Sequence, residues 1–90
     1  MRVIGPKAEL ESLYPHIRQY CDDNGYDVND INELPEDDPL QTYGADPLFV
    51  FVVSVAGGMA ANLAYDVLKQ GVLKLIERYK AAHVQIDDEE

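Results

Sequence analysis

The stretch Leu48-Phe-Val-Phe-Val-Val-Ser-Val55, followed at once by Ala56-Gly57-Gly58, decides the fold expected for this chain of 90 residues. Such a run of β-branched and aromatic residues is typical of a buried strand. After the glycines, the apolar residues recur at helical spacing. We therefore expect a central strand over residues 48–55, with Val52 among the most buried residues, and a helix over residues 59–82. The helix should pack on the strand through Leu63, Val67, Val72 and Leu75.

A membrane span is the alternative for this region, because residues 48–65 are 18 residues without a formal charge and just reach the spanning length. The segment changes halfway from strand-forming to helix-forming residues. A strand followed by half a helix explains that change, whereas one spanning helix does not. We therefore expect no membrane partner, and one continuous helix over 48–65 would contradict this interpretation.

The beginning of the chain predicts a strand and a first helix. Residues 1–4 form a short apolar segment that Gly5-Pro6 ends. The helix is expected over about residues 7–23, with Asn24-Gly25 as its stop. Pro15 interrupts the apolar stripe, but the stripe keeps its phase across it, which predicts either a kinked helix or a short turn with a helix restarting there. The stripe consists of Leu10, Leu13, Tyr14, Ile17, Tyr20 and Cys21.

Residues 22–47 carry nine acidic residues, no basic residue and three prolines. We expect a loop here, with one short strand or turn over residues 26–34. Such a long loop in a compact domain is either solvated and partly disordered or used for binding. We favour the solvated loop.

The second helix has two features that bear on packing and binding. Gly71 lies inside its apolar stripe and costs about 1 kcal/mol in helix propensity, which predicts close approach of a neighbouring segment. Leu73 points into the polar arc, with Tyr65 and Ile76 at the edge of that arc. This exposed face is less polar than a solitary monomer needs, so a homo-oligomer is compatible with the sequence.

Residues 83–86 alternate like a final short strand, and residues 87–90 form an acidic tail. The expected fold is α/β: a small β-α-β-α-(β) sandwich with a parallel pair of strands, because right-handed crossovers join consecutive parallel strands. The chain is one domain over residues 1–86, with the acidic loop at 22–47.

Composition excludes several classes of function. The net charge of −10 argues against nucleic acid as a ligand, because phosphate binding relies on lysine and arginine. The single cysteine, Cys21, cannot form an intramolecular disulfide, and no signal-peptide pattern opens the chain. We expect a cytoplasmic protein.

No catalytic, cofactor or metal residues are expected. Gly57-Gly58 before a helix resembles a phosphate cradle but lacks the accompanying residues of a P-loop or dinucleotide motif, so we favour a tight packing turn. Cys21 lies at a helix end beside Asp22-Asp23, where its thiolate is suppressed, and His16 lies about 140° around the helix from it. The acidic runs lack the spacing of a calcium loop. We expect that this protein is not an enzyme.

Two segments together resemble the effector-associated constant component proteins of bacteria: Leu10-Glu-Ser-Leu13-Tyr14 on the first helix, and Asp46-Pro-Leu-Phe-Val-Phe-Val-Val-Ser-Val-Ala-Gly57-Gly58 before a helix of small residues. The resemblance covers residues 1–86 and implies a small accessory protein that accompanies proteases, NTPases or other effectors in conflict and defence systems. The chain departs from that pattern in its long acidic loop and in lacking tryptophan. The resemblance assigns no functional site.

Two classes of function fit these observations. The first is an adaptor that binds a larger effector protein. The second is an acidic inhibitor or immunity protein that blocks a basic nuclease or nucleic-acid-binding enzyme. The residues expected to bind the protein partner lie on the acidic loop and on the exposed helix face: Glu36, Asp37, Asp38, Tyr65, Leu73 and Ile76.

Overall fold

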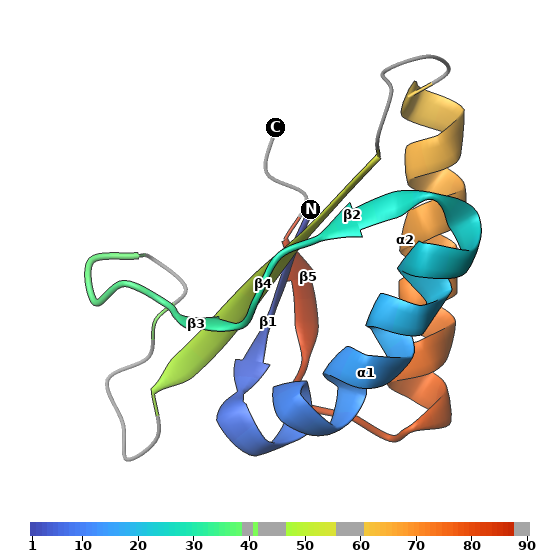
Figure 1. Cartoon of the computed structure of the whole chain (residues 1–90). Coiled ribbons are helices and arrows are strands. Elements are labelled where there is room, and N and C mark those ends of the chain that lie inside the picture. Colours follow the sequence, from blue (N-terminus) through green and yellow to red (C-terminus); the bar gives the residue numbers. More distant parts are fainter. Residues whose placement is uncertain (39–40, 42–46, 56–60, 88–90) are drawn as a thin grey trace.

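The computed structural model describes residues 1–38, 41, 47–55 and 61–87, which form a sheet with two helices beside it (Figure 1). Gly57-Gly58 and the beginning expected for the second helix, Met59-Ala60, lie outside the described residues. The elements in chain order are β1 (Arg2–Pro6), α1 (Lys7–Asn24), β2 (Tyr26–Val28), β3 (Asn32–Glu33), β4 (Leu48–Val55), α2 (Ala61–Arg78) and β5 (Gln85–Asp87).

The sheet is antiparallel, so the predicted parallel strand pair and the β-α-β-α-(β) sandwich are wrong. The strand order is β2-β4-β1-β5, and β3 also pairs with β4. β1 and β4 run in opposite directions, with Val3 opposite Phe51. The cause is that the acidic segment, which we expected to be mainly loop, forms the edge strands β2 and β3 before β4 begins. Because the chain runs the length of the sheet once more in this segment, β4 runs opposite to the predicted direction. The fold is α+β.

The topology consists of two interleaved split β-α-β units. β1 and β2 are both antiparallel to β4, so the β1-α1-β2 connection passes over the strand that lies between them. β4 and β5 are likewise both antiparallel to β1, which lies between them. If β2 and β3 count as one interrupted edge strand, this is the ferredoxin-like arrangement. That arrangement carries many functions, so it does not identify this one.

A β-bulge interrupts the edge strand between β2 and β3. Val28 pairs with Val53 and Asn32 pairs with Val50, so three residues, 29–31, lie opposite two residues of β4. The Tyr14 hydroxyl donates a hydrogen bond to the Asn29 carbonyl at 2.9 Å, which holds the bulge against α1. An extra residue reverses the alternation of side chains.

The bulge allows one edge strand to supply side chains to both faces of the sheet. Before it, Tyr26 and Val28 pack toward the helices. After it, the Leu34 side chain lies on the opposite face. The Leu34 N–H donates to the Leu48 carbonyl at 2.9 Å, which continues the pairing with β4. Leu34 is 1% exposed and Ile4, on the same face, is fully buried.

Both helices pack on one face of the sheet, and the main core lies between them and β1 and β4 (Figure 1). Phe51 and Val53 point into this core and are buried, whereas Val52 points to the opposite face and is only half-buried. The prediction that Val52 is among the most buried residues is therefore wrong. An antiparallel strand covered by helices on one side buries alternate residues, whereas the prediction assumed burial on both sides.

α1 is a single helix that includes Pro15, and it ends as expected at Asn24-Gly25. Gly25 has φ 75° and its N–H bonds to the Cys21 carbonyl, which closes the last turn.

α2 ends at Arg78, four residues before the expected end at 82. Lys80 adopts a left-handed conformation with φ 56°, and the Ala81 N–H bonds back to the Ile76 carbonyl at 3.0 Å.

The close approach predicted at Gly71 is confirmed. A Cβ atom at this position would collide with the ring and hydroxyl of Tyr20, which packs there from α1. The Tyr20 hydroxyl also donates to the Val67 carbonyl at 3.4 Å. Leu68 and Val72 are fully buried, whereas Val67 is 50% exposed, so the expected contact through the Val67 side chain is wrong.

The two outer segments differ from expectation in their bounds. β1 continues through Gly5-Pro6, and the chain at Val84 passes so close to Gly5 that an added Cβ would lie 2.9 Å from the Val84 side chain. β5 includes Asp87, which we expected in the tail; the other tail residues lie outside the described part.

β4 is a strand, not part of a helix over 48–65. Neither helix of the described chain is long and apolar enough to cross a membrane.

Candidate interaction surfaces

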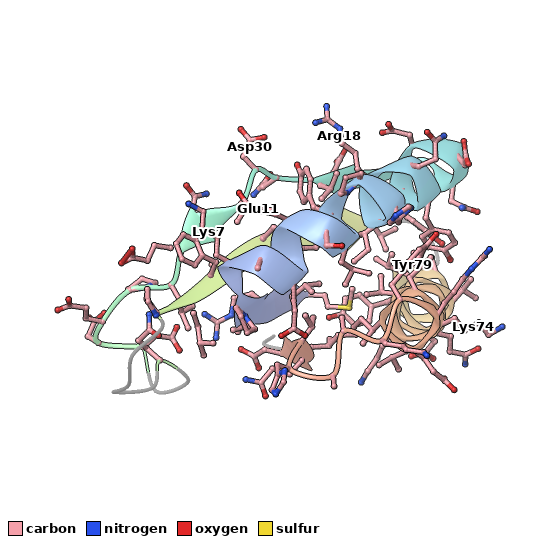
Figure 2. All side chains as sticks on the ribbon, turned by 90° about the horizontal axis from the view of Figure 1, so that it is seen from below. Lys7, Glu11, Arg18, Asp30, Lys74 and Tyr79 are labelled. Atoms are coloured by element: carbon pink, nitrogen blue, oxygen red, sulfur yellow. The ribbon has the colours of Figure 1, made fainter. Side chains whose placement is uncertain are left out.

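The most strongly charged surface of the described residues follows the end of α1, β2, the bulge, β3 and the turn after it. We call this surface the acidic edge. No lysine or arginine occurs anywhere between Arg18 and Lys69. Figure 2 shows Asp30, in the bulge, on the side of the molecule away from Lys74 of α2. All members of the acidic edge are exposed: Asp22, Asp23, Asp27, Asp30, Glu33, Glu36 and Asp37.

The acidic edge coincides with an edge of the sheet. β2 and β3 each pair on one side only, with β4. Negative side chains together with a bulge are features that prevent another strand from adding to an exposed edge. Addition of a further strand at this edge is therefore disfavoured.

The three predicted binding residues of the acidic segment do not behave alike. Glu36 and Asp37 are exposed, but the Asp38 side chain is mostly buried. The Arg2 guanidinium approaches the Asp38 carboxylate to 2.7 Å and also bonds to Asp87 of β5, with its Nε at 3.0 Å. Asp38 thus holds its segment against the sheet, and we assign it a structural role in place of partner binding.

Gln41 makes a second attachment of this segment. Its side-chain amide nitrogen donates to the Leu34 carbonyl at 2.7 Å, and its amide oxygen accepts from the Leu48 N–H at 2.8 Å. The amide thereby satisfies one backbone group at the end of β3 and one at the beginning of β4.

The predicted residues on the second helix also divide into two kinds. Leu73 is 45% exposed, as expected. Tyr65 and Ile76 are half-buried and pack against the main core. The structure does not bring these residues together with Glu36 and Asp37, because the turn after β3 lies at the opposite side of the molecule from α2 (Figure 1). The chain therefore has two separate surfaces to consider.

Cys21 is buried in the main core. Burial raises the pKa of its thiol to about 11, and the negative charge of Asp22 adds to the increase. The predicted suppression of the thiolate is confirmed, but desolvation is the larger cause, ahead of the neighbouring charge.

The two histidines contact different residues and do not contact each other's partners. His16 stacks on Tyr79, with ring centroids 4.0 Å apart. His83 pairs with Glu9 at the beginning of α1: its Nδ1 lies 2.9 Å from one carboxylate oxygen, and its backbone N–H donates to the other at 3.2 Å. Within the described part of the chain, no three histidine, cysteine, aspartate or glutamate residues are placed to hold a metal ion.

An open groove of about 570 Å³, which the sequence analysis did not predict, lies at the beginning of α1. Its lining is mostly apolar, and the Lys7 ammonium group lies 5.6 Å from the centroid of the Phe49 ring. Among the lining residues that the structure describes, Lys7 and Glu11 are the only ionisable groups and none is a nucleophile. The lining residues are Pro6, Lys7, Ala8, Glu11, Pro47 and Phe49.

Comparison with known proteins finds no matching family model, no matching curated protein and no matching solved structure. The resemblance to effector-associated constant component proteins therefore stays a prediction from the sequence.

Proposed function

We propose that this chain is a non-enzymatic accessory domain that binds a larger, basic effector protein through its acidic edge. The observation that carries the proposal is the row of exposed carboxylates along one side of the molecule, without a cation among them. Asp38 is excluded from this surface because Arg2 binds it.

Electrostatics explains what such a surface does for binding. Like charges held side by side along a strand repel one another, so a basic partner relieves that repulsion when it binds. A field of one sign also steers an oppositely charged partner and raises its association rate. The bulge and the charges oppose strand addition, so side chains carry the contact.

An inhibitor or immunity protein is the second candidate, and the same row of carboxylates favours it. Basic sites that bind nucleic acid recognise a line of negative charges. The acidic edge presents exposed negative charges from β2 through β3, and Asp30 between these strands lies on the side away from Lys74 of α2 (Figure 2). It can therefore occupy the basic site of a nuclease or nucleic-acid-binding enzyme.

The single cysteine and the negative net charge suggest the compartment and the absence of a nucleic-acid ligand, whereas the bacterial setting comes from the sequence resemblance. We infer a cytoplasmic protein of a bacterial defence or conflict system, without a nucleic-acid or membrane partner of its own. The identity of the captured partner separates the two candidates: a protease or NTPase effector supports the adaptor, and a nuclease supports the inhibitor.

The test is capture of partners from the source cell with the tagged wild-type chain and with two matched variants. Asp30→Lys changes the acidic edge, whereas Glu11→Lys makes the same change of charge at an exposed position of α1. Both residues are labelled in Figure 2. We expect a basic partner to be retained by the wild type and by Glu11→Lys, and to be reduced with Asp30→Lys. Equal retention by both variants, when circular dichroism shows both folded, would refute binding through the acidic edge.

A further inference from the structure

A ridge on α2 combines an exposed apolar residue with charges of both signs. Lys69, Leu73 and Glu77 follow one another at intervals of four, so they form one row along the helix surface. Leu73 is 45% exposed and Glu77 is exposed, while Lys69 is half-buried. α2 lies at the outside of the molecule, with α1 on one side of it (Figure 1).

The charges on this ridge are arranged symmetrically about Leu73, with opposite signs at equal distances. Four residues before it lies Lys69, and four residues after it lies Glu77. Seven residues before it lies Asp66, and seven residues after it lies Lys80, just beyond the end of the helix. Every charge at these positions therefore has an opposite charge at the mirrored position.

This pattern is complementary to itself when two helices pack antiparallel. In a contact with two-fold symmetry centred on Leu73, residues equally far from the centre on opposite sides lie at the same height. Lys69 then faces Glu77 of the partner copy, and Glu77 faces its Lys69. Rows of residues spaced by four are also the rows that interlock in the commonest helix packing, at a crossing angle of about −50°.

We propose that a second copy of this chain docks on the ridge, α2 against α2, in an antiparallel pair centred on Leu73. The inference does not rest on the proposed function. Charge complementarity identifies the occupant, because each charge at these positions faces a charge of opposite sign when the row is reversed. Asp30 of the acidic edge lies on the side away from Lys74 of α2 (Figure 2), so the bulge stays accessible in each copy of the pair.

The association is expected to be weak and reversible. A helix of 18 residues is about 27 Å long, and one helix pair buries less surface than a stable dimer needs. The net charge of −10 on each copy adds a long-range repulsion that salt screens. The dimer should therefore be measured at high protein concentration and at moderate ionic strength.

The test is sedimentation velocity of the wild type and of four variants, at concentrations up to about 1 mM. Leu73→Asp should be monomeric, because it buries two facing carboxylates. Lys69→Glu should weaken the dimer at least about fivefold, since it places like charges opposite each other. The double variant Lys69→Glu with Glu77→Lys should restore the wild-type association. Lys74→Glu is the matched control; it lies about 100° around the helix from Leu73 and should leave association unchanged.

The double variant distinguishes this pairing from any other contact of α2, since only an antiparallel self-contact exchanges positions 69 and 77. A monomeric wild type over the whole concentration range would overturn the proposal. It would also be overturned if the folded double variant stayed as weak as Lys69→Glu, or if Lys74→Glu weakened association as much. Circular dichroism and thermal unfolding confirm that each variant is folded.

Discussion

Arg2 and Asp38 are joined by an ion pair of 2.7 Å that holds the acidic segment to the sheet. The same guanidinium binds Asp87 of β5, so one side chain of β1 connects segments near the middle and the end of the chain. These side chains are mostly buried, at 21% and 13% exposure for Arg2 and Asp38. The pair therefore contributes more than an ion pair in open solvent.

Arg2→Gln is expected to lower the free energy of unfolding by about 1–3 kcal/mol, because two carboxylates lose a charged donor. Arg18→Gln, at an exposed position of α1, is the matched control and should change it by less than about 0.5 kcal/mol. Urea titration followed by circular dichroism measures both. Equal effects of the two substitutions would show that the Arg2 pairs contribute nothing specific.

Gly71→Ala should destabilise the protein even though alanine favours helix by about 1 kcal/mol. The new methyl group would collide with the ring of Tyr20. In a Tyr20→Ala background the collision is gone, so the same substitution should become neutral or stabilising. A double-mutant cycle of unfolding free energies measures this coupling, and additive effects would contradict the packing of Tyr20 on Gly71.

Lys80→Gly should raise the free energy of unfolding by about 0.5–1 kcal/mol. Lys80 has φ 56°, a conformation that costs little only for glycine. Ala82→Gly is the control, because Ala82 is not among the described residues with positive φ and glycine there should give no gain. Thermal unfolding of both variants measures the difference, and a destabilised Lys80→Gly variant would argue against this helix end.

The Cys21 thiol makes stability depend on pH at the alkaline end. Its pKa is raised by burial to about 11, from an ordinary value of 9.0. The folded state therefore keeps a proton that the unfolded state loses first, and this contribution is present below pH 9 and is lost as the pH rises toward 11. The wild type should lose about 2–3 kcal/mol more than Cys21→Ala across this window. Parallel losses in urea titrations of the two proteins would mean that the thiol ionises freely in the folded state.

Local patterns in the sequence predicted the elements better than their arrangement. The apolar run of β4 and the stop at Asn24-Gly25 depend on neighbouring residues, and both lie where expected. A correct prediction of the direction of β4 would have required recognising β2 and β3 as strands. Their exposed acidic residues suggested a loop, because a strand at the edge of a sheet carries charged, solvent-facing residues much as a loop does.

The candidate surfaces were predictable to different degrees. The exposure of Leu73 followed from helical spacing alone. The role of Asp38 could not be deduced, because its partner Arg2 lies 36 residues away in the chain and the pairing depends on the register of the whole sheet. The end of α2 at Arg78 was also not predicted, since neither glycine nor proline follows it there.

The salt dependence of association with the captured partner tests the central claim most directly. Stopped-flow mixing measures the association rate as salt rises from about 0.1 to 1 M, where the Debye length falls from about 10 to 3 Å. Binding through the acidic edge predicts a steep fall in the rate for the wild type, and Lys in place of Glu36 and Asp37 should lower the rate at low salt and flatten its dependence. A rate that is independent of salt, and unchanged by those two substitutions, would contradict the account.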